Sequence, residues 1–274
     1  MPCRINRRRA WAWRIFLETH SHDASIFVTL TYNDAHLPPG GTLVPEDYRN
    51  FLKRLRRYVE PRRFRFFCVG EYGEQTERPH FHLCLFGLDF GDRSNVVRAW
   101  SDRGDPIGFV HIGDVTLDSA QYCAGYVVKK LTSKSDPRLN GRHPEFARMS
   151  LRPGIGAPAM AILAKQLKRY KDVAMTEHGD VPLTLKIGKK DFPVHKYLRE
   201  RLRKEMEFDD DYKKEVKSLV RYEESLELQS MLQSKIAADP RSTATQKSVY
   251  LELKAQSFRN VENRAKIFDK GRKL

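Results

Sequence analysis

The sequence predicts an α+β protein built on one antiparallel sheet, and two observations lead to this class. Segments typical of strands and helices follow one another in the order β-α-β-β-α-β over residues 25–115, with a further helix after them. From Tyr197 onwards, charged and helical patterns dominate. The first observation favours a ferredoxin-like (RRM-like) sheet with helices on one face and the other face open. The second favours a C-terminal helical module.

The first half of this order rests on one strand and one helix. Residues 25–34 are β-branched and aromatic and end in Asn33-Asp34, which is typical of a strand followed by a turn. A helix is expected over 44–60, because Pro45 suits its first turn and basic residues suit its end. Its apolar residues recur at spacings of three and four and predict one buried stripe: Tyr48, Phe51, Leu52, Leu55 and Val59.

The second half repeats this alternation. We expect strands at 62–72 and 80–89, a short helix at 94–100, a strand at 108–115 and a helix at 117–131. We therefore divide the chain into four parts by composition. They are a basic N-terminal arm (1–23), a sheet domain (24–135), a basic extension containing Gly and Pro (136–200) and a charged helical module (201–274).

Composition narrows the possible partners. The 274 residues include 50 Lys and Arg against 35 Asp and Glu, a net charge of +15, which favours nucleic acid over other partners. No apolar run is long enough to span a bilayer, so no membrane partner is expected. Four cysteines lie far apart in the sequence without a C-x-x-C pair, which favours a reduced, intracellular protein.

A metal site is predicted from strand geometry. In a strand, His80 and His82 lie on one face, and the residues between and beyond them point to the other. Two histidines alone are more often surface or hydrogen-bonded residues, but a short loop allows a hairpin that brings Glu71 beside them. Two imidazoles and a carboxylate leave coordination positions open, with Glu74 as the reserve ligand and Cys84 assigned to packing. Carboxylate ligation and phosphate chemistry favour Mg²⁺ or Mn²⁺, although imidazoles also bind zinc and iron.

The helix at 117–131 carries a second candidate site. Tyr122, Tyr126 and Lys129 fall within about 60° of one another around its axis. Such residues are common at the edge of a core. Alternatively, a tyrosine hydroxyl can attack a phosphodiester to leave a phosphotyrosine and a free 3′-hydroxyl.

These motifs resemble those of a known family. RPHFHLCLF (78–86) and YCAGYVVKK (122–130) are similar to the HUH endonucleases, whose folds are of the ferredoxin-like type. More narrowly, the chain resembles the replication-associated, rolling-circle initiator proteins of microviruses of the gokushovirus type. The resemblance also rests on CRINRRRAWAWRI near the start, FVTLTYND (27–34), CVGEYGEQTERPHFHLCLF (68–86) and MSLRPGIG (149–156).

The resemblance implies a role for each of these residues. It implies metal ligands at Glu71, His80 and His82, nucleophiles at Tyr126 and Tyr122, and a helper at Lys129. Relatives with two tyrosines can carry a basic residue where this chain has Gly125, so Tyr126 is the first candidate nucleophile. The function implied is metal-dependent nicking and rejoining of single-stranded DNA at a viral origin, with the host helicase and polymerase, in the bacterial cytoplasm. DNA contacts are expected at six residues: Arg7, Arg8, Arg9, Tyr32, Arg54 and Arg57.

Two other functions are compatible with parts of the sequence. A non-catalytic nucleic-acid-binding module could use an open sheet with Tyr32 and Phe66 as stacking residues, and it would not require Glu71 to meet the histidines. An iron oxygenase with two histidines and one carboxylate would leave the tyrosine helix and the basic surplus unexplained.

Overall fold

A computed structural model describes most of the chain. The described residues are 2–126, 136–168, 180–187, 190–207, 210–237, 248–252, 255–256 and 259–260. The predicted helix at 117–131 is described as far as Tyr126, so Lys129 lies outside the described residues.

A five-stranded antiparallel sheet forms the centre of the fold, in the order β6-β1-β3-β2-β7. Four of its strands were expected, and the fifth, β7, adds an edge next to β2. Their bounds are β1 Ser25–Thr31, β2 Arg65–Tyr72, β3 Pro79–Phe86, β6 Val110–Asp114 and β7 Phe146–Met149. The α+β class is confirmed.

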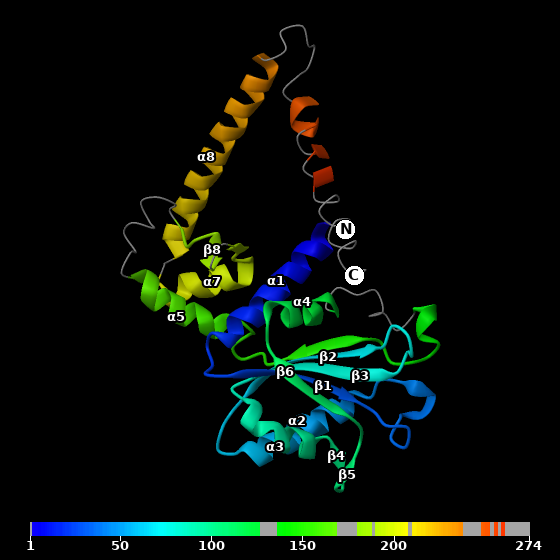
Figure 1. Ribbon diagram of the computed structural model, residues 1–274. Helices are drawn as coiled ribbons and strands as arrows, with labels where there is room; N and C mark the ends of the chain where they lie inside the picture. The colour runs from blue at the N-terminus through cyan, green and yellow to red at the C-terminus, as the bar shows by residue number, and fades with distance from the viewer. Residues whose placement is uncertain are drawn as a thin grey trace.

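One face of the sheet is covered by α2 (Pro45–Val59) and α3 (Arg93–Ala99), which lie below it in Figure 1. The predicted stripe of α2 is the buried one, from Tyr48 to Val59. It packs on the side chains that β1 and β3 direct to this face, including Val28, Leu30 and Phe81. Short segments complete this side: η1 (Pro39–Gly41), η2 (Phe90–Asp92), and the hairpin of β4 (Ser101–Asp102) and β5 (Asp105–Pro106).

The expectation of helices on one face only is wrong. Helices α1 (Pro2–Thr19) and α4 (Leu117–Tyr126) lie over the opposite face (Figure 1). The physical reason is a second apolar cluster, in which Ile15 of α1 and Ala124 of α4 pack against alternate side chains of β2 and β3. The sheet side chains of this cluster are Phe67, Val69, Cys84 and Phe86. Burying each large side chain contributes about 1.5–3 kcal/mol, so leaving this face open would be costly.

The C-terminal half packs against α1. Trp13 and Leu17 of α1 join a third cluster with α5 (Ala157–Leu167) and α7 (Lys196–Glu205). The ring of Trp13 also stacks on Phe192 of the hairpin formed by β8 (Thr184–Ile187) and β9 (Lys190–Pro193). Helix α8 (Asp210–Ala237) extends from this region (Figure 1), and η3 (Pro137–Leu139) precedes β7. The expected C-terminal helices are therefore present in the described residues.

Candidate metal and tyrosine centre

The hairpin of β2 and β3 brings the predicted ligands together. The strands pair antiparallel, with Glu71 opposite His80 and Val69 opposite His82. The connecting loop is closed by the Gly73 amide, which donates to the Arg78 carbonyl at 3.0 Å. Because side chains alternate along a strand, Glu71, His80 and His82 all lie on the face that α4 covers. The pairing expected from the loop length is confirmed.

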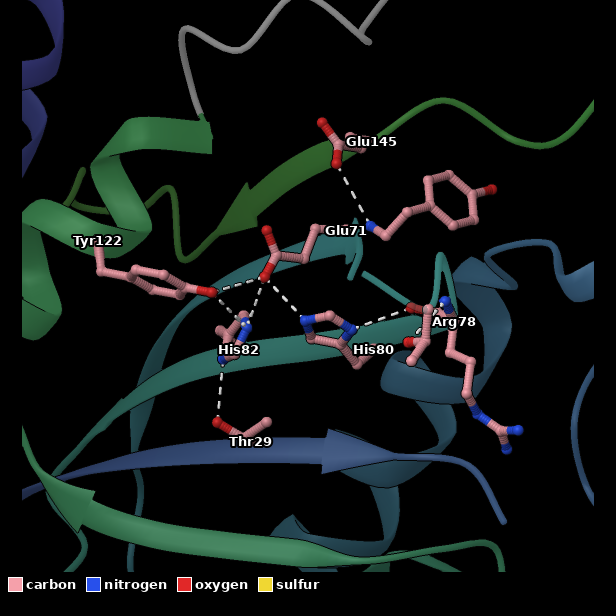
Figure 2. A network of polar contacts seen from close by, with 9 residues as sticks. Thr29, Glu71, Arg78, His80, His82, Tyr122 and Glu145 are labelled. Carbon is pink, nitrogen blue, oxygen red and sulfur yellow. Dashed lines mark hydrogen bonds and ion pairs between the residues drawn. The ribbon is translucent and has the colours of Figure 1, made fainter. Parts of the chain in front are cut away.

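The three side chains converge on one carboxylate oxygen (Figure 2). Glu71 Oε1 lies 2.8 Å from Nε2 of His80 and 2.8 Å from Nε2 of His82. One ligand atom from each residue lies within 4.8 Å of the others. Glu71 is 2% exposed, whereas the His80 side chain is 17% exposed. The group is therefore largely shielded and reachable from the side of His80.

The outer nitrogens of both imidazoles are held by neighbouring groups. Nδ1 of His80 lies 3.1 Å from the Arg78 carbonyl, and Nδ1 of His82 lies 3.0 Å from Thr29 Oγ1. A carbonyl only accepts, so Nδ1 of His80 carries the proton in this bond. The ring of His82 also stacks on Phe27, with centroids 5.6 Å apart. These contacts turn both Nε2 atoms toward Glu71, as outer groups commonly do for metal-binding histidines.

The donor set fits a divalent cation. Burial acts to raise the pKa of Glu71, but hydrogen bonds from the two histidines outweigh it and hold the pKa at about 2. The carboxylate is therefore ionised at neutral pH. Two Nε2 atoms that face this oxygen need either protons or a cation between them, because unprotonated nitrogens would place three acceptors together. Glu71, His80 and His82 can thus hold a metal ion, whose identity the donor atoms alone do not set.

Helix α4 adds two tyrosines to this centre. The Tyr122 hydroxyl donates to Glu71 Oε1 at 2.8 Å and lies 3.3 Å from His82 Nε2. The ring of Tyr126 lies one turn further along, 5.1 Å from the ring of Tyr122 and 6.4 Å from that of His82. Ala120 and Ala124 have no exposed surface and belong to the cluster that joins α4 to α1 and to the sheet. The helix and the hairpin therefore form one site.

Burial is the largest influence on both phenols. It raises the pKa of Tyr122 and of Tyr126 above the value of an ordinary tyrosine, and the charge of Glu71 acts in the same direction. Both hydroxyls are consequently protonated at neutral pH without a cation nearby. A positive charge at the histidine and carboxylate group would act against this shift.

The remaining candidates for this centre lie elsewhere. Glu74, the reserve ligand, is exposed in the hairpin loop. Cys84 is buried, with its Sγ 4.0 Å from Cys123 Sγ, which is consistent with packing. Thr29 and the Arg78 carbonyl were not found by sequence reasoning. Thr29 lies between Val28 and Leu30 on β1, and it meets His82 because β1 pairs with β3 in the register that places these two residues opposite each other.

The six residues predicted to contact DNA occupy different places. Arg7 and Arg9 are exposed on α1, and Arg8 Nε donates to the Gln121 carbonyl of α4 at 3.3 Å. Arg54 and Arg57 lie on α2, on the opposite side of the sheet from the metal group. Tyr32 is 4% exposed, and its hydroxyl donates to Asp47 at 2.6 Å. This burial gives Tyr32 a packing position that is closed to a nucleic-acid base.

No helix in the described part of the chain combines the length and the apolar character that crossing a bilayer requires.

Comparison with known proteins gives several related sequences and no matching solved structure. A family model described as "Replication-associated protein ORF2/G2P" matches residues 25–131, which include the sheet strands β1, β2, β3 and β6 and helix α4.

Three similar proteins come from bacterial viruses. The chain is 34% identical over 238 residues to "Replication-associated protein ORF2" of Spiroplasma virus 4, covering 80% of this chain and 71% of that protein. It is 35% identical to "Replication-associated protein VP4" of Bdellovibrio phage phiMH2K, covering 50% of this chain and 48% of that protein. It is 31% identical to "Replication-associated protein ORF4" of Chlamydia phage 1, with coverages of 50% and 40%. The chain belongs to this family of microvirus replication-associated proteins.

Proposed function

We propose that the chain starts rolling-circle replication by nicking single-stranded DNA at the viral origin with a tyrosine nucleophile. The observation that carries this proposal is the Tyr122 hydroxyl at 2.8 Å from Glu71, on the same oxygen that both histidines approach. A nucleophile and a group able to hold a metal thus share one centre. Family membership supports DNA as the substrate, because the relatives are named for replication.

The chemistry is a transesterification. The phenol oxygen bonds to phosphorus as the bond from phosphorus to the 3′ oxygen breaks, and the phenolic proton ends on that 3′ oxygen. The products are a 5′-phosphotyrosine and a 3′-hydroxyl that a host polymerase can extend. Since one phosphodiester replaces another, the reverse reaction can rejoin strands. Tyr126 is the first candidate nucleophile, and the contact between Tyr122 and Glu71 supports a second role for Tyr122.

Glu71, His80 and His82 would hold Mg²⁺ or Mn²⁺. When bound, this ion supplies positive charge that stabilises the developing charge on the phosphate oxygens. Thr29 and the Arg78 carbonyl fix the orientation of the imidazoles, and Phe27 limits the movement of the His82 ring. Lys129 remains a candidate helper that neutralises a phosphate or a phenolate.

The fold supports a relation to the HUH endonucleases. In a ferredoxin-like sheet the four core strands take the order 4-1-3-2, and here β6, β1, β3 and β2 stand in that order. We assign the endonuclease domain to residues 24–135 and place its activity in the cytoplasm of the bacterial host. The C-terminal helical module is a candidate contact for the host helicase.

The test is incubation of the full chain with Mn²⁺ and single-stranded DNA that carries the origin of its own genome. We expect a covalent adduct on the 5′ end of the downstream fragment and a free 3′-hydroxyl on the upstream fragment that a polymerase extends. Tyr126→Phe should abolish or strongly reduce the adduct, and Tyr122→Phe should reduce the later rejoining of strands. DNA binding without cleavage would instead support the non-catalytic module.

A further inference from the structure

A cavity of about 1020 Å³ lies on the face of the sheet opposite the metal and tyrosine centre. It is lined by α2, by α3 and by the hairpin of β4 and β5, which lie together below the sheet in Figure 1. Five arginines and one tyrosine are prominent in its lining: Arg54, Arg57, Tyr58, Arg93, Arg98 and Arg103. No acidic residue lines it. We call this space the arginine cavity.

The arginines of the cavity lack direct ion pairs within the described part of the chain, although the charge of Asp47 acts on Arg54 from a longer range. Among the described residues, none of the five arginines forms an ion pair with a carboxylate, whereas Arg62, Arg65 and Arg203 elsewhere each pair with one. The hairpin carboxylate of Asp105 contacts His36 at 3.3 Å instead. Five like charges around one space repel one another, and an anion relieves that repulsion.

Arg54 gives a second, independent observation. Its Nε donates to the Ala99 carbonyl at 2.8 Å, which anchors the guanidinium between α2 and α3. Its Nη2 is buried and has no hydrogen-bond partner in the described part of the chain. A buried donor without a partner costs about 1–3 kcal/mol, and more for a charged group. Arg54 thus holds a positive charge in the wall of the cavity that no side chain of the described residues meets with a hydrogen bond, and guanidinium groups match the geometry of phosphate oxygens.

An exposed aromatic residue three positions after Pro106, which lines the cavity, favours a ligand that carries bases. Phe109 is 76% exposed and lies between the β5 strand of the cavity hairpin and β6, the edge strand of the sheet. Exposed aromatic rings beside basic grooves are stacking platforms for single-stranded nucleic acid. The ring of Tyr58 is already covered by the Arg98 guanidinium at 4.4 Å, so Phe109 is the better candidate for stacking.

We propose that the arginine cavity binds the phosphodiester backbone of single-stranded DNA, as a second DNA site separate from the cleavage centre. The strand would pass the β6 edge, with a base on Phe109, and reach the opposite face of the sheet. The choice of DNA rests on the proposed function, whereas the requirement for a phosphate rests on the unpaired arginines. The site would hold flanking DNA while the tyrosines act on the origin.

The test compares two variants that each lose two positive charges from exposed positions. Arg57→Ala with Arg93→Ala removes cavity charges, and Arg49→Ala with Lys53→Ala removes charges from α2 outside the cavity. Fluorescence anisotropy measures binding of a long single-stranded oligonucleotide to the full chain, with EDTA present to prevent cleavage. Thermal melting checks that both variants remain folded.

We expect the cavity variant to bind the oligonucleotide at least roughly tenfold more weakly. The slope of log association constant against log salt concentration should become shallower by roughly 1.5 units, because two phosphate contacts are lost. The control should change affinity by less than about threefold. Phe109→Ala should weaken binding without changing the salt slope, because stacking carries no charge.

Equal losses in the cavity variant and the control would overturn the proposal, since net charge alone would then explain binding. A deoxynucleoside monophosphate, added at the same phosphate concentration as an unlabelled oligonucleotide, serves as a competitor. If it displaced the bound oligonucleotide equally well, the assignment to a DNA chain would be overturned. The cleavage assay tests the proposed nicking independently of this site. Binding that depends on the cavity, without any covalent adduct, would contradict the nicking and still support the arginine cavity as a DNA site.

Discussion

At the scale of single residues, the centre depends on one carboxylate oxygen that three other side chains approach. Glu71 Oε1 lies 2.8 Å from His80, His82 and Tyr122. The sequence was sufficient to predict this group, because the period of a strand, the short hairpin loop and the helical spacing of two tyrosines are all local patterns. Thr29 was not predicted, since its contact with His82 depends on how β1 pairs with β3.

The ligand roles predict a graded loss of metal affinity. Among the three proposed ligands Glu71 alone is negatively charged, so Glu71→Gln should weaken Mn²⁺ binding most. Thr29→Val keeps the strand shape but removes the hydrogen bond to His82, and a loss of about tenfold is expected for such an outer contact. Isothermal titration calorimetry of the metal-free chain measures both. His20→Ala, an exposed histidine at the end of α1, is the control, and unchanged affinity in Glu71→Gln would remove it from the ligand set.

At the scale of elements, α4 is held in place by the apolar cluster that joins it to α1 and to the sheet. Ala120 and Ala124 have no exposed surface in the cluster that contains Phe67 and Val69. A larger side chain at either position would displace α4 within this cluster. The distance between the tyrosine hydroxyls and Glu71 therefore depends on the small size of these residues.

Ala124→Leu should lower the free energy of unfolding by about 1–3 kcal/mol, because the site has no room for three more carbons. Urea denaturation measures this change, and the yield of covalent adduct should fall with it. Gln121→Leu on the half-buried side of the same helix should change stability by less than about 0.5 kcal/mol. Similar stability in both variants would contradict the packing role of Ala124.

The buried carboxylate of Glu18 links α1 by hydrogen bonds to β2 and to the segment before α5. Glu18 has no exposed surface and accepts hydrogen bonds from Arg65 of β2 and from the Gly156 amide before α5. Burial acts to raise the pKa of Glu18, but these bonds and that with His22 outweigh it, so the pKa is lowered from 4.5. A lowered pKa means that the folded state favours the ionised form.

This shift gives a stability that depends on pH. The contribution of Glu18 is present above its unfolded pKa and is lost as the pH falls through 4.5 and below. We expect Glu18→Gln to be less stable than the parent chain at neutral pH, with a difference that narrows as the solution is acidified. Urea denaturation at several pH values tests this. A difference that stays constant or widens in acid would show that Glu18 is not ionised in the fold.

Helix α1 and strand β7 were not predicted from the sequence, for different reasons. The run of arginines at 7–9 suggested a basic arm, yet α1 buries Trp13, Ile15 and Leu17. The spacing of Trp13, Phe16 and Leu17 by three and four was a local signal for a packed helix. Strand β7 had no such signal, because its four residues become a strand by pairing with β2 across more than 70 positions.

At the scale of the whole molecule, the sheet separates the metal and tyrosine centre from the arginine cavity. The metal and tyrosine centre lies under α4, and the arginine cavity lies beside α2 and α3. The sequence indicated DNA through its charge of +15, but charge alone could not show that the predicted arginines lie on both sides of the sheet. That arrangement follows from helices covering both faces of the sheet, which depends on contacts between distant segments of the chain.

The central claim is that the hairpin and α4 together form a DNA-cleaving centre, and mapping the covalent linkage tests it most directly. The chain is incubated with origin DNA and Mn²⁺ and digested with a protease and a nuclease. Mass spectrometry then locates the tyrosine that carries the nucleotide. The account predicts the modification on Tyr126 or Tyr122, and its loss in Glu71→Gln. A nucleotide on a tyrosine distant from Glu71, such as Tyr197, would contradict it.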